Sequence, residues 1–375
     1  MKRYRINVLR RHTTTPLFSA GVFVASIIAG FAAIGILFLI KGVNPFLAFY
    51  KIFSGSFFSV YGIKETITKA IPLILIATGL AVVFRSKFWN IGAESQLLMG
   101  AAFTTWVGLN LGHALPGPLL VAAMIAAGFI GGALWALPPA YLKVRFGINE
   151  VISTLMFNYI GAEIIKYLVV GPWKGKTQHG YPYTDDLPAN GILALLPGSR
   201  IHIVTLVLAL IAAAVLFYLL FRTRFGYEVR VIGENREAAK YAGIGFTKTT
   251  LLMMAISGGV AGLAGFGELA GIHHHLTYPD SISGGYGFTA IIVAWLAKLN
   301  PLLVIFSGLF FAGLVVGGDA IQISFGLPAA TVQVFNGILL VFLIMGDYFL
   351  HHKLEIVPVA LNENAEAASP VIEEE

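Results

Sequence analysis

The chain has 375 residues, 57% of them hydrophobic and 12% charged, with a formal net charge of +6 and a mean hydropathy of +0.81. A soluble domain carries about a quarter charged residues, so this composition excludes a soluble globular protein and predicts an all-α, polytopic membrane protein. The chain has no cysteine, which excludes disulfides and thiolate metal sites. Its basic residues flank apolar spans instead of forming one patch, which argues against nucleic-acid binding.

The N-terminal segment, residues 1–16, is basic and precedes an apolar run from residue 17 to residue 40. A signal peptide has a shorter apolar core and a small-residue cleavage site, so this run is predicted to be a retained first helix. Residues 42–64 are rich in aromatic side chains but interrupted by Asn44-Pro45 and Ser54-Gly55-Ser56. They predict an amphipathic segment at the outer interface of the bilayer.

The remaining apolar runs bring the expected number of transmembrane helices to about ten. They cover residues 66–84, 90–112, 118–142, 148–170, 202–221, 249–272, 286–299, 301–318 and 329–349. The run at 286–299 would cross roughly 21 Å, less than the hydrocarbon core, so it is either a tilted helix or a broken one.

Most of the 25 Lys and Arg residues then fall on one side of the membrane. The positive-inside rule makes that side cytoplasmic and predicts that both termini lie there. The expected organisation is a permease domain at residues 17–350 and a cytoplasmic polar tail at residues 351–375. We expect the tail to be disordered.

The stretch Phe-Trp-Asn-Ile-Gly-Ala-Glu-Ser-Gln, ending at Gln96, opens the third predicted span. Asn90, Glu94 and Gln96 are polar groups at the start of an apolar helix, where such groups usually face the bundle interior or water. All three are therefore candidates to line a substrate path. Glu94 has an alternative place at the cytoplasmic end of its helix, solvated or paired with Arg85 or Lys87.

Residues 147–160 open the fifth predicted span, and Asn149 is placed to cap that helix. Asn158 lies deeper in the membrane, where a lone amide must find a partner. It could form an interhelical hydrogen bond or contact the substrate. Phe157 and Tyr159 could stack on a flat base or sugar face, or simply pack.

The seventh predicted span is rich in glycine, with a small-xxx-small spacing at Gly258 and Gly262 that favours close helix packing. Glu268 follows near the outer end, where it could pair with Lys166 or line the entrance of the path. The three consecutive histidines at residues 273–275 would point apart on an extended loop. No metal site is therefore predicted.

The longest strongly polar segment between two apolar spans covers residues 222–248. Asn235 can cap a short helix from Arg236 to Ala242, and Gly243 can end it. Such a helix presents a shallow surface suited to a groove of another protein. The candidate docking residues are Gly233, Glu234, Asn235, Arg236, Glu237, Ala238, Ala239, Tyr241, Ala242, Gly243 and Ile244.

These three stretches resemble, in the expected order, motifs of ABC importer permeases that serve simple sugars, nucleosides and branched-chain amino acids. Gly-Glu-Asn-Arg-Glu-Ala-Ala-Lys-Tyr-Ala-Gly-Ile, starting at Gly233, resembles the coupling segment of that family. The stretch ending at Gln96 resembles the signature Phe-Asn-Ile-Gly-Ala-Glu-Gly-Gln, with Trp89 and Ser95 as departures. Residues 147–160 look like the start of the family's fifth helix.

The resemblance implies a permease subunit in a prokaryotic inner or plasma membrane, driven by separate ATP-binding cassette subunits docked on the short helix. It also implies an extracytoplasmic solute-binding protein and a second permease, typically a different and shorter chain. The sequence has no Gly-x-x-x-x-Gly-Lys-Ser/Thr phosphate loop. We therefore expect no cofactor and no enzymatic activity in this chain, with ATP used by the partner subunits.

An ion-coupled secondary transporter is the alternative function. It would need ionisable groups near mid-membrane and often has an internal repeat, whereas the charges here gather at the span ends. A membrane-embedded enzyme would need an acid, base or metal constellation that the sequence lacks. The form Asn-Ile-Gly-Ala-Glu-x-Gln favours nucleosides as the solute over branched-chain amino acids, with simple sugars as the alternative.

Overall fold

The computed structural model describes residues 4–11, 15–176 and 180–358. The chain divides into two compact units, which are treated separately below. The terminal unit combines residues Met1–Pro45 with Gln333–Glu375, and the central unit covers Phe46–Val332.

The terminal unit contains two helices and, in its described residues, one two-stranded antiparallel sheet. Its elements are β1 (Tyr4–Arg10), α1 (Pro16–Ile40), α14 (Ala329–His351) and β2 (His352–Pro358). The rings of Phe31 and Phe335 meet edge to face at 6.3 Å, which packs α1 against α14.

The all-α prediction is confirmed for the bulk of the described chain, and the strand pair near its two ends is a feature that it did not include. In β1, Asn7 lies opposite Glu355 of β2. Polar and apolar residues alternate along Tyr-Arg-Ile-Asn-Val-Leu-Arg, which is a strand signal that the clustered charges obscured. Disorder was predicted for the whole polar tail, residues 351–375. It is wrong for residues 351–358, which form the end of α14 and β2, and residues 359–375 lie outside the described part.

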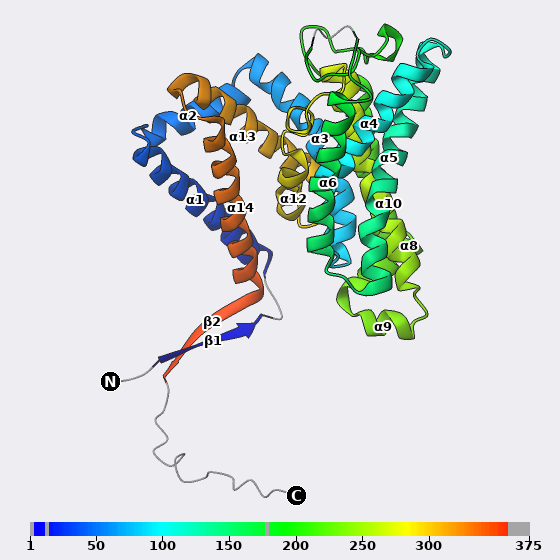
Figure 1. Cartoon of the computed structure of the whole chain (residues 1–375). Coiled ribbons are helices and arrows are strands. Elements are labelled where there is room, and N and C mark those ends of the chain that lie inside the picture. The colour runs from blue at the N-terminus through cyan, green and yellow to red at the C-terminus, as the bar shows by residue number, and fades with distance from the viewer. Residues whose placement is uncertain (1–3, 12–14, 177–179, 359–375) are drawn as a thin grey trace, which may run out of the picture. The chain divides into compact units, whose positions relative to one another are not determined.

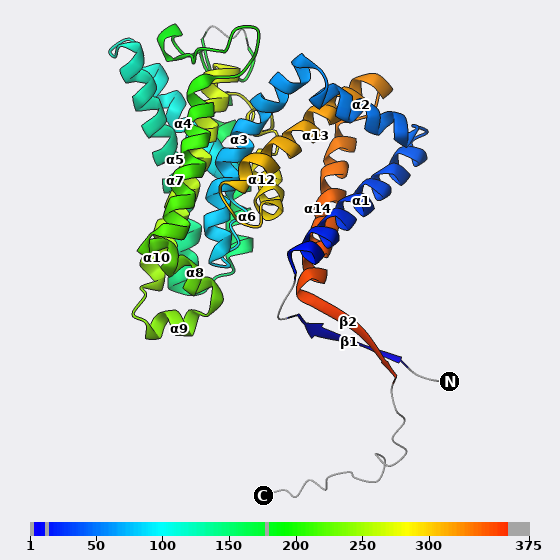
Figure 2. The same cartoon turned by 180° about the vertical axis from the view of Figure 1, so that it is seen from behind.

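The central unit is helical (Figure 1; Figure 2), and its long helices coincide with the predicted spans, although α3 begins earlier and α13 ends later than predicted. They are α2 (Pro45–Phe57), α3 (Val60–Arg85), α4 (Ala93–Leu111), α5 (Gly117–Phe146), α6 (Glu150–Val170), α7 (Ile203–Arg222), α8 (Arg224–Glu234), α9 (Arg236–Tyr241), α10 (Phe246–Gly267), α11 (Pro279–Ser283), α12 (Tyr286–Leu296) and α13 (Leu303–Phe325). A π-helix, Glu268–His273, continues α10.

Within the described residues, 6 helices are long and apolar enough to cross a membrane. They lie in α1, α3, α5, α7, α10 together with its π-helical extension, and α13. This confirms a multi-span helical protein, and the count of ten spans and the sidedness of the termini stay predictions. The short apolar run at 286–299 forms α12, which has 11 residues and ends in a turn where Lys298 and Leu299 have positive φ. Of the two alternatives, the broken helix is therefore the observed one.

Helices α4, α5 and α10 form the core of the central unit, and glycine lets them approach closely. A Cβ added at Gly262 of α10 would meet the backbone carbonyl of Gly128 and lie 3.1 Å from the Cα of Gly132, both on α5. Helices in lipid associate through packing of small residues, because lipid tails are as apolar as the side chains. The predicted close packing at Gly258 and Gly262 is confirmed.

Replacing Gly262 by Ala should destabilise the central unit by about 1–3 kcal/mol, because the added methyl group meets backbone that cannot move aside. The measurement is the thermal unfolding midpoint of the purified protein in detergent. Gly245→Ala is the matched control, since its Cβ would have its nearest neighbour at 3.9 Å. Equal midpoints for the two variants would contradict the packing argument.

Candidate functional site

The short helix predicted in the polar segment is present as α9. The side-chain oxygen of Asn235 accepts hydrogen bonds from the backbone N–H groups of Glu237 at 2.9 Å and Ala238 at 3.1 Å. Gly243 has a φ of +72°, the left-handed conformation that ends a helix. The cap, the helix and its end are thus confirmed, and the docking role of these residues stays a prediction.

One face of α9 is exposed in the described part of the chain. Tyr241 is 91% exposed, and Ala238 and Ala242 are also exposed. Ala239 is only 2% exposed and faces its own chain, so it cannot itself contact a docked partner. In Figure 1, α9 lies at one end of the central unit, beyond the ends of α5 and α10.

Helix α8 precedes α9 and was not predicted. Val229 and Ile232 are buried on one of its faces, and the hydroxyl of Thr249 donates to Glu228 at 3.1 Å. The spacing of Val229 and Ile232, together with Thr223 as a cap, is the signal that identifies it in the sequence. This helix attaches α9 firmly to the bundle.

Gly233 and Arg236 also belong to this attachment. Gly233, at the end of α8, packs against the backbone carbonyl of Arg85. The guanidinium of Arg236 lies 3.7 Å from the ring centroid of Phe246. A movement of α9 would therefore displace the end of α3 and the start of α10.

The start of α4 is organised by two amides that bind each other. Asn90 and Gln96 exchange hydrogen bonds of 3.1 Å in both directions, and the Asn90 oxygen also accepts from the Gly92 N–H at 3.0 Å. Both side chains are almost completely buried. Their amides stabilise the first turn of α4, and their role in lining a solute path stays a prediction.

Asn158 of α6 binds the same turn. Its NH₂ group donates to the carbonyl of Ile91 at 2.8 Å, and its oxygen accepts from the Ser95 N–H at 3.1 Å. The geometry is that of an interhelical hydrogen bond. Phe157 lies edge to face on Trp135 at 5.4 Å, whereas Tyr159 is 64% exposed.

Glu94 is 9% exposed and accepts two backbone hydrogen bonds from a distant segment. One oxygen accepts from the N–H of Gly285 at 3.1 Å, and the other from that of Gly287 at 2.6 Å. The alternative in which Glu94 is solvated or paired with Arg85 or Lys87 is therefore wrong. Its carboxylate binds the start of α12.

At the opposite end of the central unit from α9, a polar cavity of about 270 Å³ lies between α3, α12 and the π-helix. Glu268 lines it, is 5% exposed and lies 3.9 Å from the His273 ring nitrogen. Lys166 instead pairs with Glu163 at 2.7 Å, so the expected pair of Glu268 with Lys166 is wrong. The lining residues are Glu65, Thr68, Lys69, Arg200, Glu268, Ile272, His273, Ser281, Ile282, Gly284 and Tyr286.

Charges of both signs surround this cavity and are largely paired. Arg200 lies 3.4 Å from Glu65, and Lys69 lies 2.5 Å from Asp319. The cavity therefore offers carboxylate acceptors and cationic donors without a strong excess of either charge. That arrangement suits a neutral solute with several hydroxyl groups.

The three consecutive histidines diverge as predicted, although they lie at the end of the π-helix and in the turn after it and not on the expected extended loop. His273 lines the polar cavity, while His275 binds Asp186 at 3.0 Å and stacks on Tyr183 at 4.7 Å. Between them, His274 has a φ of +64°. In the part of the chain that the structure describes, no group of three or more metal-ligating side chains is found.

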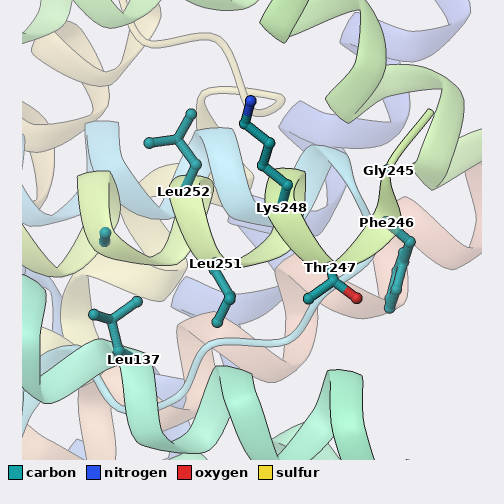
Figure 3. Close-up of a pocket in the computed structure, with 8 residues that line it drawn as sticks. Leu137, Gly245, Phe246, Thr247, Lys248, Leu251 and Leu252 are labelled. Carbon is teal, nitrogen blue, oxygen red and sulfur yellow. The ribbon is translucent and has the colours of Figure 1, made fainter.

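A second hollow of about 740 Å³ is a surface groove between α5 and α10 (Figure 3). Its described lining is apolar apart from Thr247 and Lys248. Figure 3 shows Leu251 pointing toward α5 and Lys248 pointing away from it. Although larger than the polar cavity, this groove lacks the polar groups that a hydroxylated solute would need.

The comparisons with known proteins point to transport permeases. The family model described as "Branched-chain amino acid transport system / permease component" matches residues 62–344. The chain is 32% identical to the glucose ABC transporter permease protein TsgB13 of Haloferax volcanii, over 92% of each chain. It is 32% identical to the guanosine ABC transporter permease protein NupP of Bacillus subtilis, over 84% of this chain and 90% of the relative.

A third relative is the nucleoside ABC transporter permease protein NupB of Lactococcus lactis. It is 28% identical, over 85% of this chain and 88% of the relative. These relatives come from an archaeon and from bacteria, and their names include both sugar and nucleoside permeases.

Replacing Asn158 by Leu should lower the stability of the protein by about 1–3 kcal/mol, because the Ser95 N–H and the Ile91 carbonyl would lose their partner in a buried place. Thermal unfolding in detergent measures this. The matched control is Asn110→Leu, an exposed amide bonded only locally, to the carbonyl of Trp106. Normal stability combined with lost transport would favour a solute contact instead.

Proposed function

We propose that the cargo of this chain is a nucleoside or a closely related hydroxylated solute. The chain belongs to the family of permease components of branched-chain amino acid transport systems. As a member of that family, the chain is a multi-pass membrane permease of an ABC importer and not its ATPase. The observation that carries the function is the family match across residues 62–344, most of the chain. The alternative of an ion-coupled secondary transporter is therefore wrong.

The chemistry of the polar cavity supports a hydroxylated cargo. The side-chain oxygens of Glu268 can accept hydrogen bonds from hydroxyl groups, and the guanidinium of Arg200 can donate them. Similarity to the guanosine and nucleoside permeases favours a nucleoside. A simple sugar is the second candidate, because the glucose permease relative is 32% identical over 92% of this chain.

The partners follow from the proposed role. ATP-binding cassette subunits dock on the exposed face of α9, where Ala238, Tyr241 and Ala242 are accessible, and those subunits bind the ATP, so this chain needs no cofactor. An extracytoplasmic solute-binding protein delivers the cargo. A second, different permease completes the path, and Lactococcus lactis has two similar nucleoside permeases, NupB and NupC.

Replacing Ala242 by Arg should abolish transport and detach the ATPase subunits, because a long charged side chain would occupy the shallow exposed surface. Co-purification of the ATPase with the permease and uptake by cells measure the two effects. The matched control is Ala114→Arg, an exposed alanine in the turn between α4 and α5, remote from α9. Ala239 is unsuitable because it is buried. Normal uptake in the Ala242→Arg variant would remove the docking role.

The cargo is tested by uptake of radiolabelled guanosine and glucose in cells with and without this chain, at micromolar concentrations. We expect guanosine uptake to require both the chain and an intact α9. Excess unlabelled adenosine or uridine should compete if nucleosides share the path. Glucose uptake with the same two requirements, in the absence of guanosine uptake, would replace the nucleoside by a sugar.

A further inference from the structure

Helix α12 occupies the interval between the polar cavity and the end of the central unit that carries α9. At its start, Gly284 and Tyr286 line the cavity. At its other end, the ring of Trp295 stacks on Trp89 at 5.4 Å and on Phe84 at 6.1 Å, next to the loop between α3 and α4. A short helix thus runs from the cavity toward the α9 end of the central unit.

The two ends of α12 are held by different kinds of interaction. Aromatic packing holds the end at Trp295, where the hydroxyl of Ser307 also donates to the carbonyl of Val293 at 2.9 Å. At the start of the helix, the Gly285 and Gly287 N–H groups are bound by the single carboxylate of Glu94. One side chain therefore satisfies backbone donors that have no partner within the helix itself.

Glu94 is well suited to this position because two helix N-termini converge on it. It lies in the first turn of α4, whose cap is Gly92, and it also binds the first turn of α12. Each N-terminus carries a partial positive charge that stabilises a carboxylate. Replacing that carboxylate by a neutral amide would place an NH₂ group against one of the N–H donors, and one of the two hydrogen bonds would be lost.

The backbone beside this contact uses glycine for a tight turn and for close approach. Gly284 and Gly285 have φ values of +50° and +78°, so two successive left-handed residues connect α11 to α12. A Cβ on Gly287 would lie 2.6 Å from both the Cα and a carboxylate oxygen of Glu94. Any side chain at position 287 must therefore push α12 away from α4.

From these contacts we infer that Glu94 is a positioning residue that holds α12 across the inner end of the polar cavity, so that α12 is the gate of the path. The inference rests on the proposed function in one respect, namely that the cavity belongs to the solute path. When the carboxylate releases the Gly285 and Gly287 N–H groups, the start of α12 swings on the glycine pair. The cavity then opens toward the α9 end.

The experiment uses the absence of native cysteine in the chain. Ser281, an exposed residue of α11 that lines the cavity, is replaced by Cys in the full chain within the assembled transporter. A membrane-impermeant thiol reagent is added to right-side-out or inside-out vesicles without ATP or solute. Labelling of this chain is followed on a gel. Glu94→Gln and Gly287→Ala are then introduced separately, with Glu163→Gln as the matched control on an exposed carboxylate.

Without a further substitution, the Ser281→Cys protein should react when the thiol reagent is added on the side of the membrane where the cavity lies. It should be protected when the reagent is added on the side where α9 lies. Glu94→Gln and Gly287→Ala should each raise the labelling rate from the α9 side by at least about tenfold, because a lost hydrogen bond to a charged group shifts the gate equilibrium by that order. Glu163→Gln should leave the rate unchanged. An unchanged elution volume of the solubilised transporter in size-exclusion chromatography shows that a variant is folded.

The inference is overturned if either folded variant stays protected from the α9 side. The two variants disturb the same contact from opposite partners, so a failure of one to assemble leaves the other to decide. Labelling requires neither cargo nor ATP. A wrong cargo in the proposed function would therefore change the uptake experiments and leave this result as it is.

Discussion

A helix that begins inside a membrane protein exposes backbone N–H groups, and lipid offers them no hydrogen-bond partner. The carboxylate of Glu94 meets this constraint for α12 by binding the N–H groups of Gly285 and Gly287. This contact fixes where a helix of 11 residues lies, and in the gate that we infer, the path from the polar cavity to the α9 end depends on it. Burying a polar side chain such as that of Glu94 is costly, and here the unpaired backbone N–H groups of α12 require it.

Packed contacts connect α9 with this helix. Gly233, next to α9, lies against the backbone of Arg85, and Phe84 beside it stacks on Trp295 of α12. The start of α12 in turn lines the cavity through Gly284 and Tyr286. Coupling between two sites needs an element that has two arrangements, and α12 with its glycine hinge is the element in this series suited to that role.

Local signals predicted much of the fold. Hydrophobic runs located the long helices, Asn235 and Gly243 located α9, and the shortness of residues 286–299 indicated a broken helix. The partners of Glu94 and Asn158 could not be predicted, because these bonds join residues as far as 193 positions apart. Arg85 and Lys87 were nearer in sequence, which is why the ion pair with Glu94 was a reasonable but wrong alternative. The same holds for Lys166 and Glu268.

The paired charges of the cavity bear on which solutes can pass. Glu65 and Arg200 lie close together, and so do Lys69 and Asp319, so the cavity holds polar groups without presenting one strong charge. A neutral hydroxylated solute can exchange its hydrogen bonds with water for bonds to these groups, and no charge has to be desolvated. An ion would lose far more hydration and would disturb both pairs. Nucleosides and sugars both carry hydroxyl groups that can bind these side chains. The choice between them must therefore depend on the part of the solute that carries no hydroxyl groups.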